Sequence, residues 1–444
     1  MRDASVAASA VSHFEASFAA AAMGRVLEPA WLRAARGRAA TAFSRLGFPT
    51  TRDEDWRFTN VSPIAEGRFE PSDGSFEATA ADRDRFLVPG LAGPVLVFVD
   101  GRFAPALSRL ENLPAGVEAG SLAGNLRAHR LQRHLAAYAP FDQRSFTALN
   151  TALFPDAAVV AIAPNAVVEE PIQLLFLASG RSGTASFPRA LVLAGEASQA
   201  RFVESYGSAG HEPAFTNAVT ELVVGPAAVV EHYRLQRESE RAYHVGMTQI
   251  RVGRSASVSS HNAALGGLIA RHDATVVLAE EGAESTLNGV YLAGGQALVD
   301  NHTEVDHATP HGTSHELYKG IIGGRARAVF NGRIRVRPDA QKTDAKQTNK
   351  TLLLSNEAQI NTKPQLEILA NDVRCTHGAT VGQLSADALF YLRARGIALA
   401  EARAMLVHAF AGEVIGRMRL EPVRELLDRL ISERLPDSPE KRQA

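Results

Sequence analysis

LVLAGEAS, residues 191–198, ends an apolar, strand-like run at a glycine that is followed by turn-forming residues. The same transition recurs at Pro164, Gly225, Gly253 and Gly282. Successive copies are about 28 to 31 residues apart, and a fixed period of this size is typical of stacked repeats. In such an architecture each repeat covers the apolar face of its neighbour, because no repeat can bury that face alone.

The region around this pattern, residues 155–380, contains short runs rich in Val, Ile, Thr and Tyr that are separated by Gly, Pro, Asn and Asp. Such runs are typical of β-strands, and no long helical crossover lies between them. The sequence therefore predicts a mainly β protein with a β-helix, or β-solenoid, core at residues 151–382. A large β-sandwich is the alternative fold for the same strands.

The N-terminal flank, residues 1–150, is rich in Ala, Arg and Leu. Its apolar residues at 29–46 fall near one face of a helix, and the stretch at 121–139 is also helix-like. Between them, DEDWRFTN (residues 53–60) sets two aromatic residues among charges. We therefore expect a mainly helical N-terminal region.

The C-terminal flank, residues 383–436, is predicted to form three helices, and residues 437–444 to form a disordered tail. Ser385 can cap the first helix and Gly396 can end it. The second helix carries an apolar stripe that we expect to face the solenoid or a partner: Ala402, Met405, Leu406, Ala409, Phe410 and Val414.

The bulk composition restricts the class of protein. Of 444 residues, 45% are hydrophobic and 21% are charged, as in globular proteins. The formal net charge of -1 argues against nucleic acid as a partner. A single cysteine excludes an intramolecular disulfide framework, which indicates a reducing compartment and predicts a cytoplasmic protein. No uninterrupted apolar stretch of about 18 residues predicts a membrane span.

Four histidines stand close together within residues 302–315: His302, His307, His311 and His315. Imidazoles in this number suit zinc or iron, which makes a dedicated metal site one interpretation. However, the threonines, proline and glycine between them disfavour the helix that would align three of the rings. Polar turns and a solvated face of the solenoid are the other interpretation.

A basic segment follows at residues 323–350, in which Arg333, Arg335 and Arg337 alternate with apolar residues. On a strand the three arginines share one face, which either meets an anionic partner or is simply solvated. The sequence contains neither a Walker-type phosphate loop nor a GxGxxG motif. Nucleotide hydrolysis by this chain is therefore not expected.

Cys375 is the only cysteine, and His377 stands two positions after it in NDVRCTHGATVG, residues 371–382. On a strand, residues i and i+2 point to the same face. A thiolate and an imidazole suit iron or zinc, and iron–sulfur clusters accept both. Two ligands are too few for a closed site, so another chain would have to complete it. The alternatives are a Cys–His nucleophile pair, which lacks an orienting group, and a cysteine that merely packs in the core.

Several segments of the chain resemble one known family. Residues 371–397 are similar to the C-terminal signature of the SufB/SufD family, which assembles iron–sulfur clusters, and residues 315–368 resemble it almost continuously. Residues 146–176 resemble the family's entry into its core, and DEDWRFTN resembles its N-terminal aromatic motif. Gly378 and the absence of further cysteines make the SufD-like branch the closer match.

The resemblance implies a right-handed parallel β-helix flanked by helical regions. It also implies a noncatalytic scaffold subunit that pairs with SufB through the β-helix core, or forms a homodimer in isolation. His377, together with Cys375, would contribute to a transient iron–sulfur cluster shared with SufB, and no cofactor is expected to bind tightly to the isolated chain.

The resemblance further implies that the C-terminal helices dock SufC, the ATPase of the complex, which accounts for the missing phosphate loop. The residues expected in this docking region are Phe390, Tyr391, Arg393, Arg395, Met405 and Phe410. Two other functions remain open. One is a SufB-like paralog that scaffolds the cluster directly, and the other is a stand-alone histidine-rich metal-binding β-solenoid. A β-helix enzyme acting on polysaccharide is disfavoured, because no carboxylate pair is evident.

Overall fold

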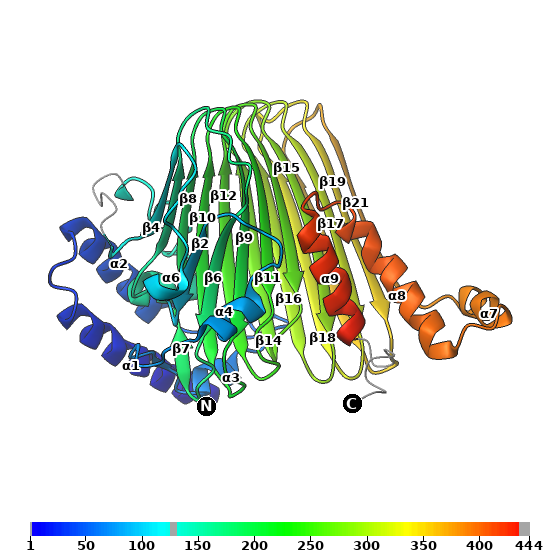
Figure 1. Cartoon of the computed structure of the whole chain (residues 1–444), viewed down its shortest axis with the longest axis horizontal. Helices are drawn as coiled ribbons and strands as arrows, with labels where there is room; N and C mark the ends of the chain where they lie inside the picture. The colour runs from blue at the N-terminus through cyan, green and yellow to red at the C-terminus, as the bar shows by residue number, and fades with distance from the viewer. Residues whose placement is uncertain (1, 125–130, 435–444) are drawn as a thin grey trace.

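The computed structural model describes residues 2–124 and 131–434, and its centre is a β-solenoid of about eight turns (Figure 1). Two long sheets run along it, and successive strands of the core alternate between them. Helices lie at both ends of the chain (Figure 1). The predicted mainly β fold with a parallel β-helix core is therefore confirmed, and the β-sandwich alternative is wrong.

Within the described residues, the first sheet has eleven strands, and all its strand pairs from β5 onward are parallel. Its main order is β20-β18-β16-β14-β12-β10-β8-β5-β4, with β1 and β7 beside it. The strands are β1 (Glu70–Pro71), β4 (Val117–Ser121), β5 (Ala158–Ile162), β7 (Thr184–Ser186), β8 (Arg189–Ala194), β10 (Phe215–Val224), β12 (Tyr243–Val252), β14 (Ile269–Leu278), β16 (Leu298–His307), β18 (Arg327–Val336) and β20 (Gln359–Ile368).

The second sheet of the described chain has ten strands in the order β21-β19-β17-β15-β13-β11-β9-β6-β2-β3, and only the β2–β3 pair is antiparallel. Its strands are β2 (Val95–Val99), β3 (Arg102–Phe103), β6 (Ile172–Ala178), β9 (Gln199–Ser208), β11 (Val229–Gln236), β13 (Ser257–Ala264), β15 (Glu284–Ala293), β17 (Thr313–Ile322), β19 (Asp344–Leu353) and β21 (Arg374–Gln383).

The repeated turn that sets the period has one left-handed residue in each copy. Asn165, Ala197, Ala227 and Ser255 all have a positive φ, between 52° and 62°, and Gly282 has a φ of 73°. The turns also stack, because the N–H of each donates to a carbonyl in the next copy, as in the 2.8 Å bond from Ala197 to the carbonyl of Pro226. The pattern of LVLAGEAS thus forms the same corner in each of these five turns of the solenoid.

The N-terminal region adds both helices and strands. Its helices are α1 (Arg2–Met23), α2 (Ala30–Leu46), α3 (Ser62–Glu66), α4 (Ala80–Phe86) and α6 (Ser145–Leu153), with 3-10 turns at Glu54–Trp56 and Pro105–Leu107. The helix predicted at 29–46 is confirmed. The helix-like stretch at 121–139 lies partly outside the described residues, and residues 132–137 form turns. The division into regions at 150 and 382 stays a prediction.

Three helices end the described chain: α7 (Ala386–Ala394), α8 (Leu399–Ile415) and α9 (Glu421–Arg434). Ser385 caps α7 by accepting the N–H of Ala388, as predicted. Figure 1 shows α8 and α9 against the solenoid and α7 standing away from it. No helix among the described residues is long and apolar enough to cross a bilayer. The predicted tail, 437–444, lies outside the described residues.

The stripe predicted on α8 is only partly right. Met405 is exposed, and the residues that α8 buries are Ala402, Val407, Ala411, Val414 and Ile415. The helix is apolar on most sides, so its sequence alone does not fix which side faces the solenoid. The contact with β15 and β17 selects that side.

Candidate metal centre

The C-terminal end of the solenoid is open. Strands β20 and β21 are the last strands of the two sheets, and each pairs along only one edge within the described chain. Their residues are exposed or only partly buried, whereas the equivalent positions of earlier strands are mostly buried. Unpaired backbone groups along such an edge are a template for another strand. This end is therefore suited to being covered by another chain.

Cys375 and His377 both lie on β21 at this open end. The parallel register pairs them with Ala345 and Gln347, which are buried inward-facing residues of β19. Both side chains are therefore on the inner face of the strand. Cys375 is partly buried, and burial, followed by the nearby Asp344 carboxylate, raises the pKa of its thiol. His377 is exposed.

The two side chains do not form a closed metal site on their own. Among the described residues, no group of three or more His, Cys, Asp or Glu side chains is arranged to hold a metal ion. A thiol and an imidazole can bind iron, but a tetrahedral site needs four ligands. Cys375 and His377 number only half of the ligands that such a site needs, and they lie at an end of the solenoid that another chain can reach.

Sequence reasoning missed the residues directly beneath His377. The register places Gln347 under His377 and Glu316 under Gln347, on three successive strands of one sheet. Both are almost fully buried, and Gln347 Nε2 donates to Glu316 Oε2 at 2.8 Å. Burial raises the pKa of Glu316 to about 7. Stepping back from His377 by one and then two periods of the repeat would have found both residues.

The four histidines of residues 302–315 are not brought together. His302 contacts Asp300 at 3.1 Å, and His307 is fully buried with its Nε2 2.9 Å from Ser314 Oγ. Burial lowers the pKa of His307 to about 4. His311 is exposed and occupies the left-handed corner of its turn, with a φ of 62°. His315 lies on the other sheet, so the histidine-rich metal-site interpretation is not supported.

The three alternating arginines of the basic segment lie on the outer face of β18 and just after it. Arg333 and Arg335 lie 3.7 and 3.9 Å from the carboxylate of Glu367. Arg337 makes a bidentate contact with Asp306, in which Nε and Nη2 donate to the two carboxylate oxygens at 3.0 and 2.6 Å. These neighbours neutralise the arginines within the chain. The solvated-face interpretation therefore accounts for them.

The helices beside the open end carry exposed apolar residues. Phe390 and Tyr391 on α7 have 75% and 59% of their surface exposed, and Met405 on α8 is also exposed. Arg393 and Arg395 are also exposed, and the Arg395 guanidinium lies 5.1 Å from the centre of the Tyr391 ring. Large apolar side chains in this number on a projecting helix are typical of a protein contact.

Phe410, the remaining residue of the predicted docking set, faces the solenoid instead. It packs against the cluster between α8 and β17. The Lys319 ammonium lies 4.3 Å from the centre of its ring, donates to its carbonyl oxygen at 2.7 Å and pairs with Glu413 at 2.5 Å. Phe410 therefore anchors α8 to the solenoid.

The aromatic motif DEDWRFTN lies on the outer face of the first sheet. The Arg271 guanidinium stacks over Trp56 at 3.6 Å and donates to the carbonyl of Asp55 at 2.6 Å. Arg271 also pairs with Asp300, which accepts the hydroxyl of Thr59 at 2.5 Å. These contacts fasten the N-terminal region to β14 and β16, so the motif has a structural role here.

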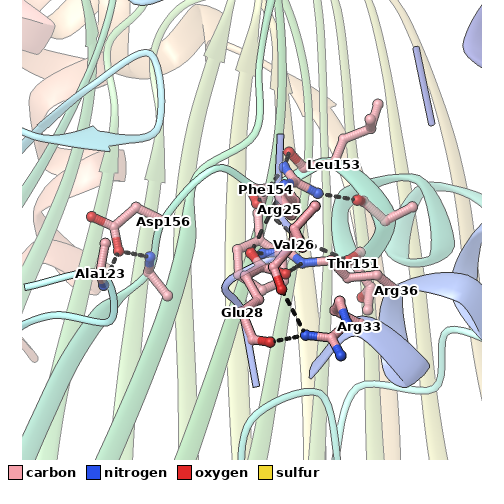
Figure 2. Close-up of polar contacts among 12 residues, drawn as sticks. Arg25, Val26, Glu28, Arg33, Arg36, Ala123, Thr151, Leu153, Phe154 and Asp156 are labelled. Carbon is pink, nitrogen blue, oxygen red and sulfur yellow. Dashed lines mark hydrogen bonds and ion pairs between the residues drawn. The ribbon is translucent and has the colours of Figure 1, made fainter. Parts of the chain in front are cut away.

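A cavity of about 920 Å³ lies between the α1–α2 hairpin and the solenoid. Figure 2 shows the polar contacts around it, in which Arg25 and Arg36 donate to carbonyl groups at the end of α6. Arg36 also holds Glu28 through two bonds of 2.9 Å, and Asp156 accepts the N–H of Ala123 (Figure 2). These side chains are occupied in fastening the hairpin and the helix end.

Fold and site together define a β-solenoid protein whose last rung carries a thiol and an imidazole and is left uncovered. Two family models match consecutive parts of the chain: the SufBD protein N-terminal region at residues 20–174 and the SufBD core domain of SUF-system FeS cluster assembly at 176–410. The chain belongs to the SufBD family of iron–sulfur cluster assembly proteins.

Individual relatives agree with this assignment. A SufBD family iron–sulfur cluster assembly protein of Synechocystis is 35% identical over 89% of this chain and 90% of its own length. The iron–sulfur cluster assembly protein SufD of Escherichia coli is 32% identical over 88% of this chain and 90% of its own length. SufD of Bacillus subtilis is 25% identical over 92% of this chain and 95% of its own length.

Proposed function

We propose that this chain is a noncatalytic, SufD-like scaffold subunit that assembles iron–sulfur clusters in the cytoplasm together with SufB and SufC. The observation that carries the proposal is the uncovered last rung with Cys375 and His377 on its inner face. A SufB chain that covers β20 and β21 would supply the missing ligands. The cluster would then form between the two solenoids and leave with its acceptor, so that it is a product and not a resident cofactor.

The ATPase SufC would dock on the projecting helices. The exposed rings of Phe390 and Tyr391 and the side chain of Met405 form the apolar part of this surface, and Arg393 and Arg395 form its charged part. Because α8 is anchored on β15 and β17, movement of SufC would be transmitted to the solenoid two to three strands from its open end. Such movement would open the paired solenoids to iron and sulfide.

Co-expression with SufB and SufC tests this function. We expect a stable complex, and we expect His377→Ala to leave the complex intact while reducing cluster formation on it, measured by the visible absorption and iron content of the reconstituted complex. Thr376→Ala is the matched control, because Thr376 is on the same exposed strand but points to its opposite face. Normal clusters with His377→Ala would overturn the role of His377.

The docking surface is tested separately. Replacing Phe390 and Tyr391 with serine removes two exposed rings without touching the core, so we expect the chain to fold and to retain SufB but to lose SufC. Size-exclusion chromatography of the co-expressed proteins reports both contacts. Retention of SufC by this double variant would contradict the docking assignment.

A further inference from the structure

The rung beneath His377 contains buried amide groups that lack part of their hydrogen bonding. Gln347 and Asn349 are each 1% exposed, and Gln347 Oε1 and Asn349 Oδ1 have no hydrogen-bond partner in the described structure. A buried acceptor without a donor costs about 1–3 kcal/mol. Both orphan atoms are acceptors, so what they lack is an N–H or O–H group, or a cation.

The amide of Gln347 is held in one orientation. Its Nε2 donates to Glu316 on β17, which lies on the side away from β21. The amide also rests on Gly332 of the opposite sheet, where a Cβ would lie only 2.3 Å from Nε2. The absence of a side chain at Gly332 gives the amide its place. Nε2 is engaged by Glu316, so Oε1 is the amide atom without a partner, and β21 is the neighbouring strand from which a donor could reach it.

The same column of the solenoid already contains a histidine that is held from neighbouring rungs. His232 stands five rungs before His377, in the register that runs through Ser260, Leu287, Glu316 and Gln347. One nitrogen of His232 lies 3.1 Å from Ser260 Oγ on the next rung, and the other lies 2.9 Å from Glu204. A side chain of an adjacent rung can therefore reach an imidazole in this column.

We propose that Gln347 is a positioning residue for His377: when a partner covers the open end, the free Gln347 Oε1 accepts the N–H of one imidazole nitrogen. The other nitrogen then keeps its lone pair and faces the partner, where it can bind iron. Metal-binding histidines commonly donate their second N–H to a carbonyl or carboxylate, which fixes the tautomer and the ring orientation. Glu316 acts one step further back, by holding the amide.

This inference rests on the proposed function, and its test uses the full chain in complex with SufB and SufC. Gln347→Met keeps the length of the side chain but has no acceptor, so we expect cluster formation per complex to fall about tenfold or more. Gln347→Glu keeps an acceptor oxygen, and below about pH 7 the protonated Glu316 can donate to its second oxygen in place of the lost amide N–H, so at pH 6.5 we expect this variant to restore most of the yield. Equal yields from the Met variant and the unmodified chain would overturn the proposal.

A second readout does not depend on the cluster. With ¹⁵N-labelled histidine, the cluster-free complex should show one dominant tautomer of His377 for the unmodified chain and for Gln347→Glu, and a mixture for Gln347→Met. An unchanged tautomer in Gln347→Met would overturn the inference even if its cluster yield falls, because that fall would then be a packing effect.

The two proposals can fail separately. If His377→Ala abolishes clusters while Gln347→Met does not, only the positioning role is wrong. If His377→Ala builds normal clusters, the ligand assignment is wrong and the positioning role is overturned with it.

Discussion

The buried carboxyl group of Glu316 should make the stability of this protein depend on pH in a measurable way. Glu316 is 4% exposed, and burial raises its pKa from 4.5 to about 7, although its hydrogen bond from Gln347 acts in the opposite direction. The folded chain therefore holds this proton at pH values at which the unfolded chain releases it. Stability from this group is fully present below pH 4.5 and is lost as the pH rises toward 7 and above.

Glu316→Gln removes the titration and keeps the shape of the side chain. At about 1.4 kcal/mol per pKa unit, the shift from 4.5 to about 7 corresponds to roughly 3 kcal/mol. We therefore expect the free energy of unfolding of Glu316→Gln, relative to that of the unmodified chain, to increase by about 3 kcal/mol between pH 4.5 and pH 8, because only the unmodified chain loses stability over this range. All other groups titrate equally in both proteins, so their contributions cancel in the difference.

Urea unfolding of both proteins at several pH values between 4.5 and 8 measures this difference directly. Glu357→Gln is the matched control, because Glu357 is exposed and its substitution should shift stability equally at each pH. A stability difference that stays constant across this range would refute the reasoning, since Glu316 would then ionise equally in the folded and unfolded chains.

Three further substitutions test other parts of the solenoid. His307→Asn should remove an acid-dependent loss of roughly 3 kcal/mol between pH 6.5 and 4, because burial lowers the pKa of His307 to about 4; an equal acid loss in urea unfolding of the variant would contradict this. Gly332→Ala should displace the amide of Gln347 and lower the free energy of unfolding by about 1–3 kcal/mol, whereas an unchanged urea midpoint would show that the amide has room to move. Ala227→Gly should increase the free energy of unfolding by up to about 1 kcal/mol and so raise the thermal midpoint, because Ala227 has a φ of 55°, a left-handed conformation that glycine adopts without strain. A lower midpoint would mean that the larger chain entropy of glycine outweighs the relief of strain.

Much of the fold could be predicted because each turn of the solenoid needs the same corner, so the same residue types recur in the sequence at a fixed period. The corner residues Ala197, Ala227 and Ser255 share one backbone conformation, and the apolar run before each corner must return to the same place in the next rung. A glycine and turn residues at a constant spacing record that requirement in the sequence. The side of α8 that is buried could not be predicted in the same way, because it depends on contacts with strands far away in the chain.

The candidate site likewise contains residues that the sequence reveals and residues that only the structure reveals. Cys375 and His377 were found because a thiol and an imidazole two residues apart are visible in the sequence. Gln347 and Glu316 were missed, because an amide and a single carboxyl group signal no chemistry until the register places them under His377. In a solenoid, residues that are neighbours on adjacent strands are one full repeat apart in the sequence, so motifs of short spacing do not reveal them.

The difference between the two ends of the solenoid limits how far an assembly of such chains can grow. At the N-terminal end the sheets finish in the short strands β3 and β4, which pair antiparallel with their neighbours, while the other end finishes in two exposed ten-residue strands. Short edge strands are poor templates for further pairing. A chain of this kind can therefore be extended in one direction only. When two such chains meet through their open ends, each terminates the other, so the product is a closed pair and not a fibre.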